Sequence, residues 1–366
     1  MHVGLSMFFQ GAHTQLDDHA IVRNQLEFAD EAEARGFQSL WTAEHHFTRY
    51  HMMPNPLQLL TYLAGRTKTV QLGTMVVVLP WHDPIRVAEE AAWLDTVSGG
   101  RLVLGFGRGL GPVEFDAFRL EMGESRQRFT EYATAITEGL ESGVMRSDGE
   151  LYKQPDAELH PPPVRSFRGR TYVSAVSPES APIAAKLGYG LLLIAQKPWK
   201  TTIEETNSYR DMFVDINGYE PPAPILVNFT TVDESPARAK ELHEEYTVGY
   251  ARSTVEHYDF TNPRLEHVNG YEYYAGLRRN INKHGLPAFN RFLADLQIGG
   301  TPDEVVEQVV DRVRALGAGG VLNVLNPGPM PHDVARRCFD TYVDKVLPKL
   351  RAIDTHREIC VPLGTV

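Results

Sequence analysis

Short apolar runs alternate with longer amphipathic stretches along the chain. Residues 3–9 (VGLSMFF) form a compact apolar run, and residues 21–35 then place apolar side chains at helical spacing before Gly36. This order of strand and then helix repeats. The other expected strands are 38–44, 70–78, 101–106, 171–176, 189–194, 225–231 and 320–325, and the other expected helices are 56–66, 84–97, 125–141, 179–187, 202–214, 235–252, 301–316 and 331–347.

About eight strand–helix units favour a parallel (β/α)8 TIM barrel, an α/β fold, over a doubly wound sheet. We expect one barrel domain over residues 1–350, followed by a C-terminal tail, 351–366. A Pro/Gly-rich stretch, 143–170, interrupts the rhythm after the fourth strand, and an aromatic-rich, irregular insert near 253–298 precedes the eighth.

Composition and charge narrow the class of protein. Hydrophobic residues make up 42% of the 366 residues and charged residues 23%, which is enough apolar material for a sizeable core. The net charge of −11 and the lack of Lys/Arg runs argue against a nucleic-acid partner. We find no secretory leader and no run of about 18 apolar residues, so we expect a cytoplasmic protein without a membrane partner. Cys338 and Cys360 are expected to be reduced and structural.

Three histidines gather where the second expected strand becomes a loop, in LWTAEHHFTRYHMMPNP (residues 40–56). Barrel enzymes place their chemistry at these strand ends. Because side chains alternate along a strand, Trp41, Ala43 and His45 group together and His45 is expected at the barrel mouth. His46 then points away, so the two cannot easily share a metal ion, and no metal is expected. The alternative is that these histidines are hydrogen-bonded loop residues.

Glycines with one arginine close the fourth strand, in GFGRGLG (residues 105–111). The dinucleotide-binding fingerprint would need glycine where Leu110 stands, so this is not a nicotinamide site. Bare backbone amides and a guanidinium suit an anion, although a tight turn would explain the glycines equally well. With Arg108, the donors Arg126, Ser177 and Ser180 at loop and helix starts describe a phosphate pocket after strands 4 and 5.

At this point the sequence resembles a known family. The stretches LWTAEHHFTRYHMMPNP, LGTMVVVLPWHDPIRVAEEAAWLDTVSGGRLVLGFGRG, YVSAVS and IGGTPDEVVEQV are similar, in this order, to the bacterial luciferase family of flavin-dependent monooxygenases. The resemblance implies a (β/α)8 barrel that binds reduced FMN (FMNH2) and O2, forms a C4a-peroxyflavin and oxygenates a small organic substrate.

The resemblance also assigns roles to single residues. His45 matches the family's active-site histidine, and we expect Glu44 to orient it. The FMN phosphate positions fall on Arg108, Arg126, Ser177 and Ser180, with Val176 beside them in place of an acidic residue. Leu110 falls where a residue packs near the flavin. A non-prolyl cis peptide beneath the flavin ring falls on Met75 and Val76.

One departure concerns the chemistry: Gly107 stands where luciferases have a reactive cysteine, which puts light emission in doubt. The insert near 253–298 matches the luciferase mobile loop and is expected to act as a lid, or else to be a surface excursion packed by its own aromatics. The aromatic side chains that would cover the site are Tyr258, Phe260, Tyr271, Tyr273 and Tyr274.

The expected function is therefore an FMN-dependent monooxygenase with a small, apolar organic substrate and a separate flavin reductase as the source of FMNH2. Residues near strand ends that suggest an apolar pocket are Phe8, Phe9, Trp41, Phe47 and Phe106. A deazaflavin (F420) dependent oxidoreductase and a non-catalytic flavin-binding subunit stay open as alternatives. Relatives pair through barrel helices 2 and 3, and Ala88, Ala91, Ala92 and Trp93 on helix 84–97 suggest the same homodimer here.

Overall fold

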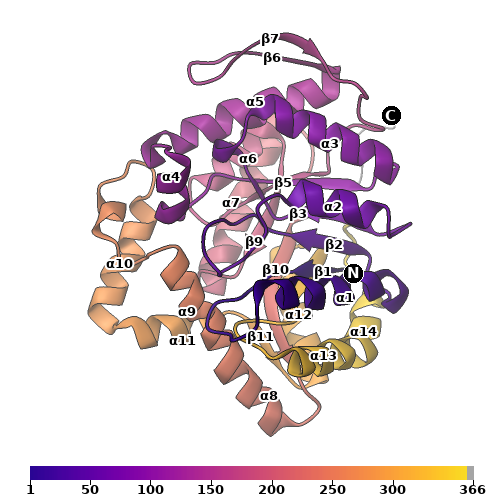
Figure 1. Ribbon diagram of the computed structural model, residues 1–366, viewed down its shortest axis with the longest axis vertical. Helices are drawn as coiled ribbons and strands as arrows, with labels where there is room; N and C mark the ends of the chain where they lie inside the picture. The colour runs from indigo at the N-terminus through magenta and orange to yellow at the C-terminus, as the bar shows by residue number, and fades with distance from the viewer. Residues whose placement is uncertain (361–366) are drawn as a thin grey trace.

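Eight parallel strands close into a barrel in the computed structural model, which describes residues 1–360 (Figure 1). The last barrel strand pairs with the first, and β9 pairs with β10, so the ring has no free edge. In order around the ring the strands are β1 (His2–Met7), β2 (Ser39–Thr42), β3 (Gln71–Thr74), β5 (Leu102–Gly107), β8 (Thr171–Ser174), β9 (Gly190–Ile194), β10 (Ile225–Val232) and β12 (Gly320–Val324). The (β/α)8 TIM barrel is thus confirmed.

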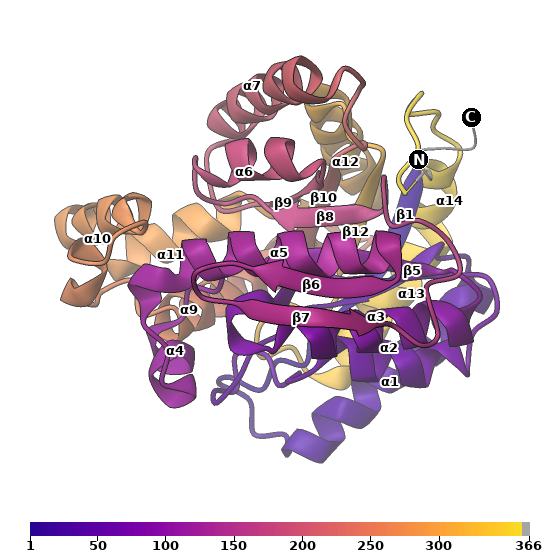
Figure 2. The same ribbon diagram turned by 90° about the horizontal axis from the view of Figure 1, so that it is seen from above.

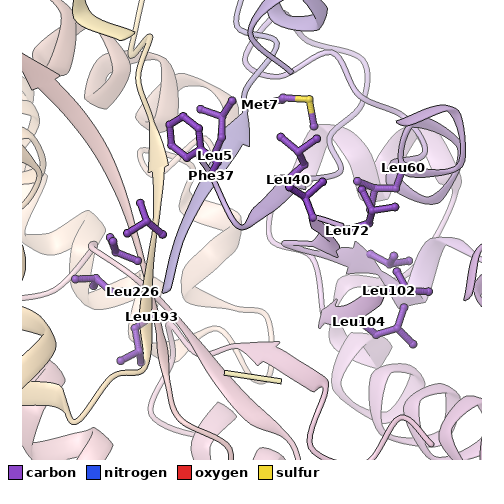
Figure 3. Packing of buried hydrophobic residues seen from close by; sticks show 14 of the residues in the cluster. Leu5, Met7, Phe37, Leu40, Leu60, Leu72, Leu102, Leu104, Leu193 and Leu226 are labelled. Atoms are coloured by element: carbon purple, nitrogen blue, oxygen red, sulfur yellow. The ribbon is translucent and has the colours of Figure 1, made fainter. Parts of the chain in front are cut away.

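Alternating side chains divide the core into an outer and an inner layer. Leu102 and Leu104 of β5 point outward into the layer between strands and helices, together with Leu40 of β2 (Figure 3). Trp41 and Val103 belong to the apolar cluster inside the barrel. Successive side chains of a strand point to opposite faces, and both faces of these strands are buried. The strands therefore have continuous apolar runs in the sequence.

Helices surround the ring and are capped as the sequence predicts. Asp83 accepts a hydrogen bond from the backbone N–H of Ile85 at the start of α3, and Gly99 ends that helix in the left-handed conformation. The helices of the outer layer are α1 (Asp18–Arg35), α2 (Pro56–Ala64), α3 (Pro84–Ser98), α5 (Ser125–Ser142), α6 (Ser180–Leu187), α7 (Trp199–Asn217), α8 (Pro236–Leu242), α9 (Val248–His257), α12 (Pro302–Leu316), α13 (His332–Thr341) and α14 (Leu347–Arg351). A π-helical turn joins α8 to α9 and another joins α13 to α14, so each pair forms one predicted helix.

Some expected elements differ from the structure. The strand expected at 70–78 is broken into β3 and β4 (Val77–Val78) by a cis peptide between Met75 and Val76. The insert near 253–298 is mostly helical, containing α10 (Glu272–His284), α11 (Leu286–Asp295) and the short strand β11 (Ile298–Gly300). These helices lie together at one side of the barrel, next to α9 (Figure 1).

A hairpin and a short helix outside the insert were also not expected. The Pro/Gly-rich stretch contains an antiparallel hairpin of β6 (Val144–Asp148) and β7 (Lys153–Glu158), which lies along α5 (Figure 2). A short helix, α4 (Pro112–Phe118), follows the glycine-rich end of β5. The hairpin has mostly exposed, polar side chains and therefore lacks the apolar alternation that predicts a strand.

The alanines expected in a dimer interface are instead part of the chain's own core. Ala88, Ala91 and Ala92 are at most 1% exposed, because α3 packs these small side chains against neighbouring elements of the outer layer, whereas the Trp93 side chain is 52% exposed. Cys338 and Cys360 are buried and free. Within residues 1–360 we find no helix that is both long and apolar enough to cross a membrane. The expected tail starts where α14 ends, and its residues 361–366 lie outside the described residues.

Candidate active site

One cavity opens at the carboxyl ends of the barrel strands, as in other barrels of this type. The segments after β2, β3, β5, β8 and β9 line it, and the insert contributes two tyrosines. All of the predicted site residues except Arg126 lie on its wall: Glu44, His45, Met75, Val76, Arg108, Leu110, Val176, Ser177 and Ser180. The fold therefore brings together residues from five strand ends.

His45 lies on the cavity wall, as the strand parity predicts. Its Nε2 lies 3.3 Å from the hydroxyl of Tyr258, and its Nδ1 lies 3.2 Å from Oε1 of Glu114. His46 points away from the cavity and packs its ring against Trp81 and Phe118. One face of the loop thus carries the imidazole that lines the cavity, and the other carries an imidazole packed against aromatic rings.

Glu44 does not orient His45, which corrects the expectation. Its fully buried carboxylate accepts hydrogen bonds from Nε2 of His46 at 3.0 Å, from Nε2 of His82 at 2.6 Å and from the backbone N–H of Val78 at 2.8 Å. The side chains of Glu44 and His45 point to different sides of the chain, so Glu44 reaches the imidazole of His46 and not that of His45. Burial opposes ionisation, but the hydrogen bonds from His46 and His82 lower the pKa of Glu44.

Glu114, on α4, is the carboxylate that holds His45. Its side chain is fully buried, and Oε1 also accepts from the backbone N–H of His46 at 2.8 Å. Burial works against the ionised form, but the charge of His45 and the hydrogen bonds from His257 and His45 lower the pKa of Glu114 to about 2. Glu114 is therefore ionised at neutral pH.

His257, at the end of α9, completes this group. Its Nε2 lies 3.1 Å from Nδ1 of His45, and its Nδ1 lies 2.7 Å from the hydroxyl of Thr48. Burial lowers the pKa of His257, and the hydrogen bond with Glu114 opposes that shift. Sequence reasoning missed both Glu114 and His257, because they lie 69 and 212 residues away from His45 and no local motif marks them.

His51, the third histidine of the motif, is structural. Its Nδ1 accepts from the backbone N–H of Phe9 at 2.9 Å, so its Nε2 carries the proton and donates to the carbonyl of Ala43 at 3.1 Å. Burial, reinforced by the charge of His45, lowers the pKa of His51 well below its usual value. This neutral ring fixes the loop that presents His45.

A second polar group contains the predicted phosphate residues, with Arg108, Ser177 and Ser180 on the cavity wall and Arg126 beside it. Arg108 donates from Nη1 to the carbonyl of Gly270 at 2.8 Å, and Arg126 donates from Nη2 to the same oxygen at 3.4 Å. The guanidinium of Arg108 also lies over the ring of Tyr271, 4.3 Å from its centroid. Two cations from different elements thus converge on one oxygen of the insert.

The donors around this point fit an anion. The buried Nε of Arg126 has no hydrogen-bond partner among residues 1–360, although its Nη2 lies 3.7 Å from a carboxylate oxygen of Glu179. The hydroxyls of Ser177 and Ser180 lie 3.1 Å apart at the start of α6. Guanidinium and hydroxyl groups of this kind donate strong hydrogen bonds to phosphate oxygens. These side chains therefore fit the phosphate of FMN.

The peptide between Met75 and Val76 is cis, as the resemblance implies. Both residues line the cavity beside Gly107. A Cβ atom built on Gly107 would lie 2.4 Å from Cγ2 of Val76, so no larger residue fits at 107 beside this valine. Position 107 carries no thiol because its side-chain space is already filled.

The apolar wall of the cavity differs from the expected one. Met75, Val76, Val78, Trp81, Leu110 and Ile194 line it together with Tyr258 and Tyr274 of the insert. The side chains expected there do not: Phe8 and Trp41 pack inside the barrel, Phe9 and Phe106 pack in the outer layer, and Phe47 is exposed. Sequence proximity to a strand end did not reveal which face each ring occupies.

Comparisons with known proteins agree with this fold. The family model described as luciferase-like monooxygenase matches residues 1–319. The alkanal monooxygenase alpha chain of the Kryptophanaron alfredi symbiont is 28% identical over 311 residues, 83% of this chain and 86% of that one. The oxygenase component of the flavin-dependent trigonelline monooxygenase of Acinetobacter baylyi is 29% identical over 256 residues, 68% of this chain and 70% of that one.

Solved structures show the same barrel. The oxygenating constituent of 3,6-diketocamphane monooxygenase from Pseudomonas putida, a type II Baeyer-Villiger monooxygenase in complex with FMN, superposes with a TM-score of 0.72 at 20% identity, covering 96% of this chain and 98% of that one. The coenzyme F420 dependent tetrahydromethanopterin reductase of Methanopyrus kandleri superposes with a TM-score of 0.66 at 18% identity, covering 95% and 99%. F420-dependent relatives thus share the fold.

Proposed function

The chain belongs to the luciferase-like monooxygenase family, and from that premise we propose that it is the oxygenase of a two-component system that uses reduced FMN and O2 to oxygenate a small organic substrate. The observation that carries the proposal is one cavity lined both by an anion cradle, made of Arg108, Ser177 and Ser180 with Arg126 beside them, and by a hydrogen-bonded His45. The cradle suits the phosphate of a flavin, and the imidazole suits proton transfer beside it.

Reduced FMN, when bound, would supply two electrons to O2, so that one oxygen atom enters the substrate and the other leaves as water. Arg108, Arg126, Ser177 and Ser180 would hold its phosphate. Met75, Val76, Leu110 and Val176 would contact the rest of the cofactor on the cavity wall. The chain itself then has to exclude water and manage protons.

His45 would manage those protons at its Nε2. The ionised carboxylate of Glu114 accepts the proton on Nδ1, which leaves Nε2 toward the cavity and Tyr258. A base held in one tautomer by a carboxylate can take a proton at Nε2 and return it. Tyr258 is buried, which raises its pKa well above the usual value, so it stays a neutral hydroxyl that can donate to Nε2.

The substrate would be small and mainly apolar, because aliphatic and aromatic side chains such as Met75, Val76 and Ile194 line the cavity together with His45. Tyr258 and Tyr274 of the insert line the cavity, and the insert would act as a lid that excludes water from the reaction. The name of the Acinetobacter relative, an oxygenase component, supports a separate reductase as the source of reduced FMN.

We also propose a homodimer that uses α2 and α3. These neighbouring helices carry the half-exposed side chains Tyr62 (49%), Trp93 (52%) and Val97 (44%). Exposed aromatic side chains are the type most enriched in protein interfaces.

An isotope experiment tests the function. The purified chain, supplied with FMNH2 by a generic flavin reductase and NADH, is mixed with ¹⁸O2 and a panel of small ketones, aldehydes and aromatic compounds. One ¹⁸O atom per product molecule, formed only when FMN is present, is the expected result. Oxygenation that proceeds equally well without flavin, or a failure to oxygenate any compound of the panel, would contradict the proposal.

An F420-dependent oxidoreductase is the second candidate, because proteins of that class share this fold. It would transfer a hydride without O2. Oxidation of reduced F420 under anaerobic conditions, coupled to reduction of an organic substrate, would favour this candidate over the monooxygenase. An FMN requirement with ¹⁸O incorporation would exclude it.

A further inference from the structure

Three potential metal ligands converge beside the cavity, from three separate elements. They are Nδ1 of His45 after β2, Oε1 of Glu114 on α4 and Nε2 of His257 at the end of α9. The two nitrogens lie 3.1 Å apart, and Oε1 lies 3.2 Å from His45 and 3.5 Å from His257. The three atoms therefore form a nearly equilateral triangle.

Protons alone satisfy this triangle poorly. Nδ1 of His45 and Nε2 of His257 lie 3.1 Å apart, so a single proton lies between them. The nitrogen without this proton directs its lone pair toward the other ring and lies beside the lone pairs of the carboxylate oxygen of Glu114. The second carboxylate oxygen, Oε2 of Glu114, is buried and has no hydrogen-bond partner within residues 1–360. A buried group with unmatched lone pairs is a place where a cation is favoured.

The triangle has the size of one face of a tetrahedral metal site. With bonds of about 2.0–2.1 Å, a tetrahedral zinc ion holds its ligand atoms about 3.3–3.4 Å apart. The observed separations of 3.1, 3.2 and 3.5 Å bracket that value. Two imidazoles and one carboxylate suit zinc, cobalt or nickel, whereas magnesium and calcium prefer sites made of oxygen.

The surrounding hydroxyls support the same interpretation. The ring nitrogen of His257 that faces away from the triangle bonds the hydroxyl of Thr48 at 2.7 Å, and that of His45 faces the hydroxyl of Tyr258 at 3.3 Å. Such outer contacts fix the ring orientation of metal-binding histidines. Each imidazole is thus held with one nitrogen toward the triangle.

We propose that His45, Glu114 and His257 form a binding site for one divalent ion of the zinc class. The ion would bind to Nδ1 of His45 in place of the proton that this nitrogen otherwise donates to Glu114. Ion binding and proton handling by His45 would therefore exclude each other, and zinc would inhibit turnover reversibly.

Zinc binding is measured without flavin or turnover, so its failure is distinguishable from failure of the proposed function. The full chain is treated with a chelator and titrated with Zn²⁺ against a chromophoric competitor, and bound zinc is counted by mass spectrometry. We expect one tight equivalent per chain. His257→Gln and Glu114→Gln should each weaken it more than about 100-fold, since losing even an outer partner costs about 10–100-fold.

A control and a milder variant make the test decisive. His13→Gln removes a surface histidine paired with Glu256 at 2.7 Å and should leave the tight equivalent unchanged. Thr48→Val, which keeps all three ligands, should weaken zinc binding about 10–100-fold and serves if His257→Gln does not fold. The proposal would be overturned if the unaltered chain bound no zinc tightly. It would also be overturned if His257→Gln, or Thr48→Val where His257→Gln does not fold, bound zinc as tightly as the unaltered chain.

Discussion

Replacing each arginine of the anion cradle by alanine tests whether the cradle holds a phosphate. If it does, Arg108→Ala and Arg126→Ala weaken the binding of reduced FMN and hardly change the binding of reduced riboflavin, which has no phosphate. A charge-assisted hydrogen bond contributes about 1.5–3 kcal/mol.

The structure ranks the two losses. Arg108 already donates to the carbonyl of Gly270 at 2.8 Å and must exchange that bond for the phosphate, which places its contribution near 1.5 kcal/mol, or about tenfold in affinity. Arg126 reaches the same carbonyl only at 3.4 Å, and its buried Nε has no partner within residues 1–360. The Arg126 guanidinium also lies 3.7 Å from a carboxylate oxygen of Glu179, but both side chains are more than a third exposed, so this pair contributes little. The loss for Arg126→Ala therefore lies near 3 kcal/mol, about 150-fold.

Anaerobic titration calorimetry with FMNH2 and reduced riboflavin measures both affinities. Arg119→Ala is the matched control, since Arg119 is an exposed arginine at the end of α4 that bonds a carbonyl of its own helix. Equal losses for the two flavins would refute the cradle. A larger loss of FMN affinity for Arg108→Ala than for Arg126→Ala would show that Arg108 is not weakened by its bond to the carbonyl of Gly270. It would still be consistent with phosphate binding by both arginines.

Three further outcomes are expected. His45→Ala should lower product per reduced flavin by about 10²–10⁴-fold with a matching rise in hydrogen peroxide, whereas His46→Ala costs little; equal effects would remove the assigned role. Burial opposes a charge on His82, but the carboxylate of Glu44 raises the pKa of His82. The stabilisation is then complete below about pH 6.5 and is lost as pH rises through the higher folded pKa, so His82→Asn should lower the melting temperature more at pH 6 than at pH 9, and an equal drop would refute it. Light scattering should show a dimer that Trp93→Lys weakens by about 2 kcal/mol or more, and a wild-type monomer at micromolar concentration would reject the interface.

Local sequence patterns predicted the barrel because the spacing of apolar residues differs between strands and helices and can be recognised in each element separately. The alternation in β2 placed Trp41 inside the barrel and His45 at its mouth, and Asp83 with Gly99 predicted both ends of α3. The hairpin β6–β7 was not predicted because most of its side chains are polar, so it lacks the alternation of apolar and polar residues that marks a strand.

The site was predicted only as far as local order reaches. The partner of His45 was assigned to its neighbour in sequence, Glu44, but the fold turns Glu44 toward His82 and supplies Glu114 instead. Contacts such as that between His45 and His257, 212 residues apart, depend on how loops meet above the barrel. The spacing of apolar residues along the chain does not indicate which loops come into contact.

The close approach of Val76 to Gly107 has a consequence for how this lineage can change. A β-branched side chain is stiff at χ1, so Val76 cannot swing aside to admit a thiol at 107. A cysteine there requires a shorter residue at 76 in the same chain. We therefore expect the two positions to covary among relatives, and we expect a mutational screen that varies position 107 alone to recover glycine and miss cysteine.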